Sequence, residues 1–248
     1  MGTGGRPGYH RATVVGGGVI GISWTALFLA HGLEVTVCDP LPDVAERVRA
    51  GLREIAPTLA QLGLSVDALT GSTDALRFDP EVASAVAGVD VVQENGPERP
   101  EVKQPLGSAI EASAPANALL ASSSSGIPAS VMSQAMRRPG RLVVGHPFNR
   151  PHLVPLVEVV PSPGTDPEVV EAAVAFYRAM GKQPQVLSRE IRVRRQPAAG
   201  RPVPRGGPPR RPRGGHRAGA GCRLLLKLPL TCGSWGVGGG LEPPTCCL

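Results

Sequence analysis

The chain has 248 residues and a net charge of +6, and 42% of its residues are apolar. That apolar content is enough for one large or two smaller globular domains. No apolar run reaches the roughly 18 residues of a membrane helix, and the first residues lack the apolar core of a signal peptide. We therefore expect a cytoplasmic protein with no membrane span.

The charge is divided sharply near residue 191. Residues 192–248 hold ten arginines, one lysine and one acid, Glu242. The positive charge of this segment is larger than the net charge of the whole chain, so residues 1–191 carry a net negative charge. Glycine and proline supply 21 of the residues in this segment. This composition predicts a disordered tail over 191–248, after a flexible N-terminus over 1–11 and one domain over 12–190.

The five cysteines follow the same division. One lies in the predicted domain and four lie in the tail: Cys38, Cys222, Cys232, Cys246 and Cys247. Their spacing lacks the paired pattern of zinc ligands, so we predict no metal site. Cys38 is interpreted as a small core residue in a reducing compartment.

The first predicted elements surround a glycine-rich turn. An apolar run at 12–15 is followed by glycines in G-x-G-x-x-G spacing, a helical pattern, a second apolar run at 35–38 and an acid. Strand, glycine turn, helix, strand and acid in this order indicate a dinucleotide-binding fold. The turn would admit a pyrophosphate at the helix N-terminus, and the acid would accept ribose hydroxyls, which favours NAD over NADP. The predicted cofactor-binding residues are Gly16, Gly18, Val19, Ile20, Gly21 and Asp39.

Strand and helix patterns continue to alternate along the domain. We predict strands at 76–78, 90–94, 119–122, 141–146, 156–160 and 185–187. We predict helices at 42–63, 80–87, 97–114, from 128 and at 167–180, with a distortion of the third at Pro105 and Gly107. This alternation predicts an α/β fold, a Rossmann-like doubly wound and mostly parallel sheet.

Three polar residues follow or end predicted strands, where such folds bind ligands. Ser125 lies in ASSSSGIP, His146 ends the strand RLVVGH, and Glu158 lies inside the apolar strand LVEVV. A carboxylate among apolar neighbours needs a polar partner. A histidine held by a carboxylate is a common general acid or base, which alcohol oxidation by NAD requires.

Residues 12–190 resemble the L-3-hydroxyacyl-CoA dehydrogenase family, and within it the branch that contains lambda-crystallin (L-gulonate 3-dehydrogenase). The matching stretches are GGGVIGISW, VQENGPER followed by Lys103, ASSSSGIP, GHPFNRPHLVPLVEVV and the helix that ends in YRAMGK. The resemblance implies that His146 is catalytic, with Glu158 as its partner, and that the family serine is Ser125. It also implies that Asn149 lies beside the nicotinamide and substrate, and that Glu98 and Lys103 lie near the cofactor.

The chain departs from the family pattern at two places. Arg150 replaces a proline at a loop position next to His146 that we expect to be buried. From Arg192 on, RVRRQPAAGR stands where the family has P-G-F-hydrophobic-x-N-R and then the helices of its dimer interface. A one-base shift of the codons permits G-F-V-A-N-R at this point, so we interpret the tail as a frameshift product that replaces the helical dimerisation domain.

Three functional hypotheses follow. The first is NAD-dependent oxidation of the 3-hydroxyl of an L-3-hydroxyacyl-CoA, with free L-gulonate or another small 3-hydroxy acid as the alternative substrate. The second is a truncated remnant that binds NAD but is catalytically impaired. The third, nucleic-acid binding by the basic tail, is disfavoured because Trp235 is the only aromatic residue there that could stack on bases.

Overall fold

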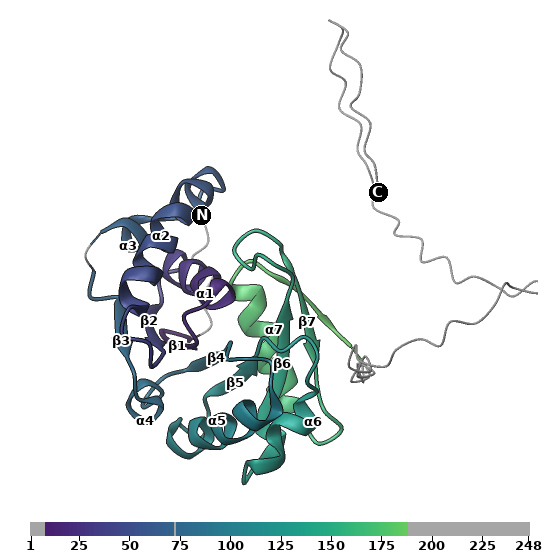
Figure 1. Cartoon of the computed structure of the whole chain (residues 1–248). Coiled ribbons are helices and arrows are strands. Elements are labelled where there is room, and N and C mark those ends of the chain that lie inside the picture. The colour runs from purple at the N-terminus through teal and green to yellow at the C-terminus, as the bar shows by residue number, and fades with distance from the viewer. Residues whose placement is uncertain (1–7, 72, 188–248) are drawn as a thin grey trace, which may run out of the picture. The chain divides into compact units, whose positions relative to one another are not determined.

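The computed structural model describes residues 8–71 and 73–187. Among these, eight strands form one sheet in the order β3-β2-β1-β4-β5-β6-β7-β8, which confirms the predicted α/β sheet (Figure 1). All neighbouring strands pair in parallel except β6 and β7, which are antiparallel. The strand order reverses between β1 and β4, and ligands of such sheets bind beyond the carboxyl ends of the strands at this switch point.

The strands are short. They are β1 (Arg11–Val15), β2 (Glu34–Cys38), β3 (Leu76–Asp79), β4 (Val91–Glu94), β5 (Leu119–Ser122), β6 (Leu142–Pro147), β7 (Leu156–Val160) and β8 (Gln183–Val186). Successive residues of β1 point to opposite faces, so Val14 and Val15 join different hydrophobic clusters. The sheet is therefore covered on both faces.

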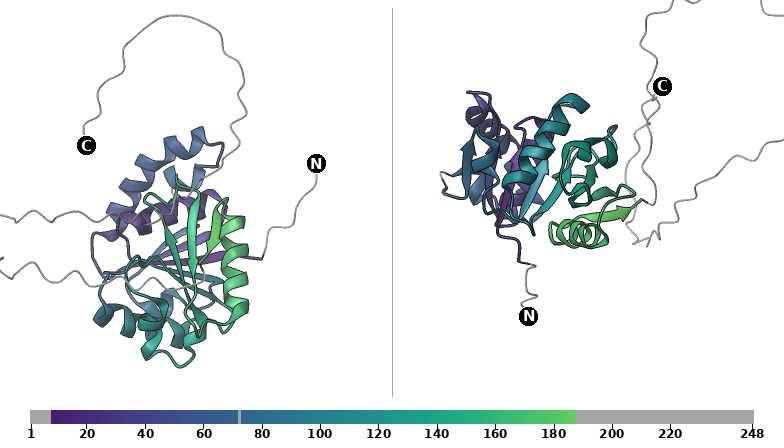
Figure 2. Two further views of the ribbon diagram at one scale, coloured as in Figure 1. Left: turned by 90° about the vertical axis from the view of Figure 1, so that its right-hand side faces the viewer. Right: turned by 90° about the horizontal axis from the view of Figure 1, so that it is seen from below.

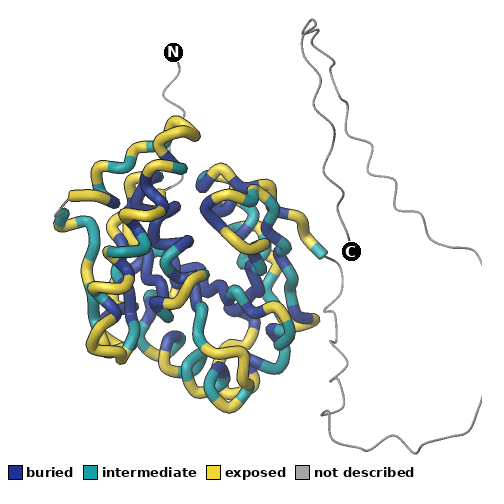
Figure 3. Tube along the Cα trace, turned by 45° about the horizontal axis from the view of Figure 1, so that its top comes forward, coloured by how far each residue is buried: buried dark blue, intermediate teal, exposed yellow. Residues whose placement is uncertain are grey.

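Helices supply the two covering layers (Figure 2). The cluster on one face includes residues of α1 (Val19–Ala30), α2 (Val44–Gln61), α3 (Asp67–Thr70) and α7 (Pro167–Ala179). The cluster on the other face includes α4 (Val82–Ala85), α5 (Pro100–Ser113) and α6 (Ala129–Met132), and two 3-10 turns follow at Ser133–Ala135 and Pro139–Arg141. Buried chain runs through the middle of the domain and exposed turns surround it (Figure 3).

Most predicted elements are present, with some boundaries corrected. The helix predicted from 97 begins at Pro100 and continues through Pro105 as one helix. Pro105 lies in the second turn, so its missing N–H removes only a bond to Glu101 in the first turn. The last strand covers 183–186 rather than 185–187, and the 3-10 turns and α3 lack the length that would give a periodic signal.

Two further predictions concern membrane spans and the tail. Among residues 8–71 and 73–187, no helix is both long and apolar enough to cross a bilayer. The predicted disordered tail, its four cysteines and the frameshift at Arg192 lie outside the described residues.

Candidate active site

The turn between β1 and α1 brings the backbone close to other backbone atoms at Gly16 and Gly21. Gly16 has a φ of 96°, and a Cβ there would lie 2.9 Å from the carbonyl oxygen of Asn95. A Cβ on Gly21 would lie 1.9 Å from the carbonyl oxygen of Gly16, whereas a Cβ on Gly18 would meet no atom within 4 Å. Gly16 and Gly21 therefore serve the packing of the turn, while Gly18 borders open space that a phosphate group can approach.

The N-terminus of α1 offers hydrogen-bond donors beside this space. The first bond within the helix runs from the N–H of Ile22 to the carbonyl of Gly18, at 2.8 Å. The N–H groups of Val19, Ile20 and Gly21 precede it and have no helical carbonyl to bind. The first turn contains no acid, and its cap residue, Gly18, has no side chain. Such an end attracts anions.

Asp39 follows β2 as predicted, and its carboxylate fixes the glycine turn. Its Oδ2 accepts the N–H of Gly17 at 2.8 Å, and its Oδ1 accepts the N–H of Leu41 at 3.0 Å. Each carboxylate oxygen can accept more than one hydrogen bond. Asp39 therefore retains acceptor capacity toward ribose hydroxyls.

His146 and Glu158 are brought together by the antiparallel pairing of β6 and β7, whose register sets them opposite each other. Nδ1 of His146 lies 3.0 Å from Oε2 of Glu158, and about a quarter of each side chain is exposed (26% and 27%). A carboxylate at Nδ1 holds the ring proton on that nitrogen, which leaves Nε2 as the acceptor. This arrangement can perform general base chemistry.

Glu98 holds the loop that carries Ser125. Its Oε1 accepts the Ser124 hydroxyl at 2.6 Å and the N–H groups of Ser125, Gly126 and Ile127 at 3.0, 2.7 and 3.2 Å. Partial burial alone raises the pKa of Glu98, but these hydrogen bonds and the positive charge of Lys103 outweigh it and lower the pKa below its usual value. Glu98 is therefore ionised at neutral pH and fixes the loop after β5.

Lys103 lies beneath the site in a buried ion pair. Its Nζ donates to both carboxylate oxygens of Glu94, at 2.9 and 2.7 Å, and lies 3.8 Å from Oε2 of Glu98. Only 3% of Lys103 is exposed. Glu94 also accepts the Ser122 hydroxyl at 2.5 Å and the N–H of Gly96 at 2.6 Å. This network fixes the carboxyl ends of β4 and β5 next to the switch point.

These parts meet around one cavity of about 330 Å³. Its lining includes, from the predicted site, Ile20, Glu98, Lys103, Ser125, His146 and Asn149. Glu158 does not line this cavity, but together with His146 and Ser125 it borders a smaller hollow of about 50 Å³. The structure thus unites six predicted residues at one cavity, and Glu158 adjoins it through its contact with His146. The remaining predicted residues, Gly16, Gly18, Val19, Gly21 and Asp39, form the glycine turn, the helix end and the acid at one side.

Arg150 does not occupy the buried position that we expected. It is exposed, in the loop between β6 and β7. Its carbonyl accepts the N–H groups of Leu153 and Val154, both at 3.0 Å, in a turn. The prediction was wrong because a guanidinium without a partner keeps its hydration at the surface of a turn. Asn149, which precedes it, is also exposed.

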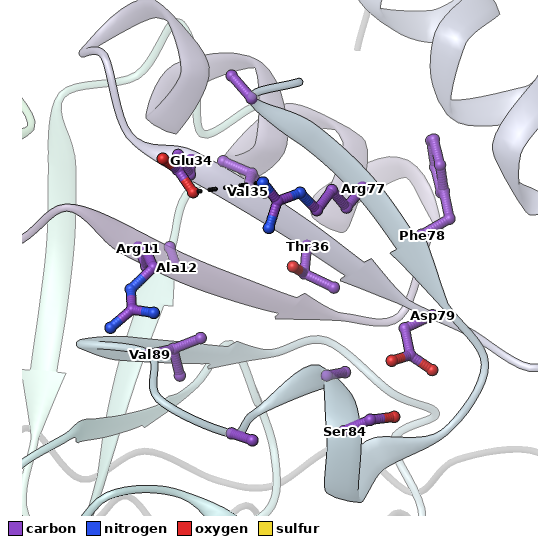
Figure 4. A pocket seen from close by; sticks show the side chains of 13 residues that line it. Arg11, Ala12, Glu34, Val35, Thr36, Arg77, Phe78, Asp79, Ser84 and Val89 are labelled. Carbon is purple, nitrogen blue, oxygen red and sulfur yellow. Dashed lines mark ion pairs between the residues drawn. The ribbon is translucent and has the colours of Figure 1, made fainter. Parts of the chain in front are cut away.

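Another hollow of about 270 Å³ lies between β1, β2, β3 and the chain around α4 (Figure 4). Its charged residues include Arg77 and Glu34, which are 3.9 Å apart, together with Arg11 and Asp79. It shares no lining residue with the cavity beside His146. Opposite charges of equal number give it no preference for an anion or a cation.

Sequence reasoning missed three buried polar residues that lie in, or bond to, the loop between β6 and β7. Ser23, His152 and Lys182 are 1%, 5% and 7% exposed. The Ser23 hydroxyl lies 2.7 Å from Nδ1 of His152 across 129 residues of sequence, so no local spacing could have linked the two. Lys182 donates to the carbonyls of Pro151 and Val154. The one available signal was their polarity within segments that otherwise build the core.

The described residues fit a bound dinucleotide. Gly18 has no side chain and borders open space, so a ligand can reach its backbone. The first N–H groups of α1, which have no partner within the helix, lie next to Gly18. Asp39 follows the adjacent strand, β2. These three features lie at the carboxyl ends of β1 and β2, beside the switch point. Each corresponds to one part of an NAD molecule, namely pyrophosphate for the first two and ribose for the third.

Comparison with known proteins agrees with this geometry. Residues 11–191 match the family model of the 3-hydroxyacyl-CoA dehydrogenase, NAD binding domain. L-carnitine dehydrogenase of Streptomyces griseus is 45% identical over 182 residues, which are 73% of this chain and 53% of that protein. 3-Hydroxyacyl-CoA dehydrogenase of Gibberella moniliformis is 40% identical over 183 residues, which are 73% of this chain and 56% of that protein.

A solved structure of a diketoreductase superposes with a TM-score of 0.68 at 26% identity, covering 74% of this chain and 66% of that one. The chain spans about half the length of the curated relatives that it matches. The chain belongs to the 3-hydroxyacyl-CoA dehydrogenase family of NAD-dependent oxidoreductases, whose NAD-binding domain it contains.

Proposed function

We propose that the chain oxidises the 3-hydroxyl of a small L-3-hydroxy acid to a ketone, with NAD as the oxidant. The observation that carries the proposal is the 3.0 Å contact between His146 and Glu158 at the wall of a cavity that Ser125 and Asn149 share. Nε2 of His146 accepts the hydroxyl proton, and Glu158 holds the ring and stabilises its positive charge. Ser125 binds the reacting oxygen.

A bound NAD would supply the hydride acceptor for this oxidation. The turn at Gly16, Gly18 and Gly21 and the N–H groups of Val19 and Ile20 would hold its pyrophosphate. Asp39 would hold the adenosine ribose, and Asn149 would lie near the nicotinamide. Glu98 and Lys103 support the site indirectly. Glu98 fixes the Ser125 loop, and Lys103 fixes Glu94 at the end of β4.

L-carnitine is the substrate that we favour. The chain is 45% identical to a relative of that activity over 182 residues. The cavity also offers an exposed aromatic ring, Phe148, which suits a quaternary ammonium group. An L-3-hydroxyacyl-CoA is the second candidate, because a relative of that activity is 40% identical over 183 residues. L-gulonate, and with it the lambda-crystallin branch, stays a prediction from sequence resemblance.

The activity of the chain as it stands is a separate proposal. We propose that residues 12–190 form the cofactor domain and that the segment from 191 on does not supply the dimerising half of the family. On this proposal the chain binds NADH but turns substrate over far more slowly than a relative of full length. A cytoplasmic location also stays a prediction.

The test compares substrates and variants in one assay. NADH formation is followed with L-carnitine, L-3-hydroxybutyryl-CoA and L-gulonate, and L-carnitine is expected to be oxidised fastest. Glu158→Gln should lower kcat by about 100-fold or more with unchanged NADH binding, since it removes only the charge behind His146. Glu168→Gln, at an exposed position of α7, is the matched control. Equal loss in both variants, or turnover that survives Glu158→Gln, would overturn the catalytic assignment.

A further inference from the structure

The cofactor helix and the loop after His146 are joined by one hydroxyl group. The Ser23 hydroxyl on α1 lies 2.7 Å from Nδ1 of His152, and it accepts the backbone N–H of His152 at 2.9 Å. Both residues are almost fully buried. The hydroxyl thus contacts the main chain and the ring of one residue at once.

The hydrogen bonds of the Ser23 hydroxyl reach both the backbone and the ring of His152. A hydroxyl has one proton and two acceptor lone pairs, so the Ser23 oxygen can accept the backbone N–H of His152 and at the same time bond to Nδ1. Burial, and then the positive charges of Arg150 and Lys182, lower the pKa of His152 and keep the ring neutral.

The two ends of this contact lie in different parts of the site. Ser23 follows Gly21 by two residues, so it is rigidly connected to the glycine turn. His152 lies in the loop 148–155, whose first residues, Phe148 and Asn149, line the cavity. Phe148 is 40% exposed and Asn149 is also exposed, so the loop has few apolar contacts there that could fix it.

Buried hydrogen bonds supply that fixation instead. Lys182, just before β8, donates to the carbonyls of Pro151 and Val154 and so joins the loop to the start of β8. Ser23 joins the loop to α1. Among the described contacts of His152, the bond to Ser23 is the one that reaches α1.

We propose that Ser23 and His152 are positioning residues, which form a clamp that holds the loop 148–155 against the cofactor helix. The clamp keeps Asn149 and Phe148 in register with a cofactor bound at the glycine turn. Ordering of α1 by the cofactor is transmitted to the loop through this contact. The part that concerns turnover rests on the proposed function, whereas the clamp itself does not.

Hydrogen exchange and NMR test the clamp on the whole chain. Long-range nitrogen–proton spectra should show the His152 ring neutral at pH 7. The His152 amide should exchange slowly, and saturation with NADH should slow it further. Ser23→Ala should speed its exchange by about tenfold and abolish the NADH effect, since one buried hydrogen bond is lost. Ser65→Ala, at an exposed serine, is the control.

A second pair of variants separates positioning from folding. Asn and Leu have similar size, but only Asn offers an oxygen near the place of Nδ1. His152→Asn should retain slow amide exchange and most of the kcat/KM. His152→Leu should lose about tenfold in kcat/KM with its NADH affinity within about twofold of the parent.

The outcomes are distinct. An unchanged His152 amide in Ser23→Ala, or equal behaviour of His152→Asn and His152→Leu, would overturn the clamp. If NADH fails to bind, the proposed function is wrong, while the Ser23→Ala exchange rates still decide whether the clamp exists. If NADH binds without slowing the His152 amide, the coupling to the cofactor is wrong.

Discussion

At the scale of single residues, the site depends on how each ionisable group is paired. His146 is backed by Glu158, Lys103 by Glu94, and Glu98 by four donors of the Ser125 loop. Each of these groups has a hydrogen-bonded partner that fixes its position. Lys182 differs, because its partners are backbone carbonyls, and burial lowers its pKa to about 8.

This property of Lys182 predicts how stability changes with pH. The amine of the unfolded chain titrates near 10.5, so between about pH 8 and 10.5 the unfolded state binds more protons than the folded state. The free energy of unfolding should therefore rise in this window, by at most about 1.4 kcal/mol per pH unit. Urea unfolding of the parent and of Lys182→Met at several pH values measures the rise. Parallel pH profiles of the two proteins would contradict the prediction.

A second residue-scale prediction concerns Glu98. Glu98→Gln should loosen the loop 124–127, because an amide oxygen accepts N–H bonds more weakly than a carboxylate. Hydrogen exchange of the Gly126 amide should speed up by about tenfold, and activity should fall. Glu101→Gln, on the exposed start of α5, is the control. An unchanged Gly126 amide would show that the loop does not depend on the Glu98 charge.

At the scale of elements, the turn between β1 and α1 combines packing and ligand binding in neighbouring glycines. Gly21 lies where a Cβ would overlap the backbone of Gly16, and Gly18 lies where a Cβ would point into open space. Substitution of Gly18 should therefore affect cofactor binding, whereas substitution of Gly21 should affect the stability of the fold.

Gly18→Ala should leave the melting temperature unchanged and weaken NADH binding by about tenfold, because the methyl group occupies the approach of the pyrophosphate. Gly21→Ala should destabilise the fold by about 2–3 kcal/mol, because α1 must shift from the turn. Thermal melts and NADH titrations of both variants separate the effects. Loss of stability in Gly18→Ala would show that this position serves packing too.

At the scale of the whole molecule, local patterns predicted the fold and long-range contacts defined the site. The alternation of strands and helices was sufficient for the parallel sheet, since it depends on short-range periodicity. The pairing of His146 with Glu158 was predicted from a motif and follows from the antiparallel register of β6 and β7. That strand reversal has no local signal of its own.

Contacts across many residues escaped prediction. Ser23 and His152 are 129 residues apart, and only the packed fold brings them together. Arg150 is exposed because it lies in a turn, where its carbonyl accepts the N–H groups of Leu153 and Val154. Glu98 was expected near a cofactor, but its bonds to the loop after β5 became visible only with the structure. Sequence patterns therefore located the residues better than they located their partners.

The most direct test of the account is a fluorescence titration of the chain with NADH, run in parallel on Gly18→Ala. The account predicts saturable binding with a Kd of about 1–100 μM and about tenfold weaker binding in Gly18→Ala. Absence of saturation up to about 1 mM NADH, or equal affinity in the two proteins, would contradict the assignment of the glycine turn as the cofactor site.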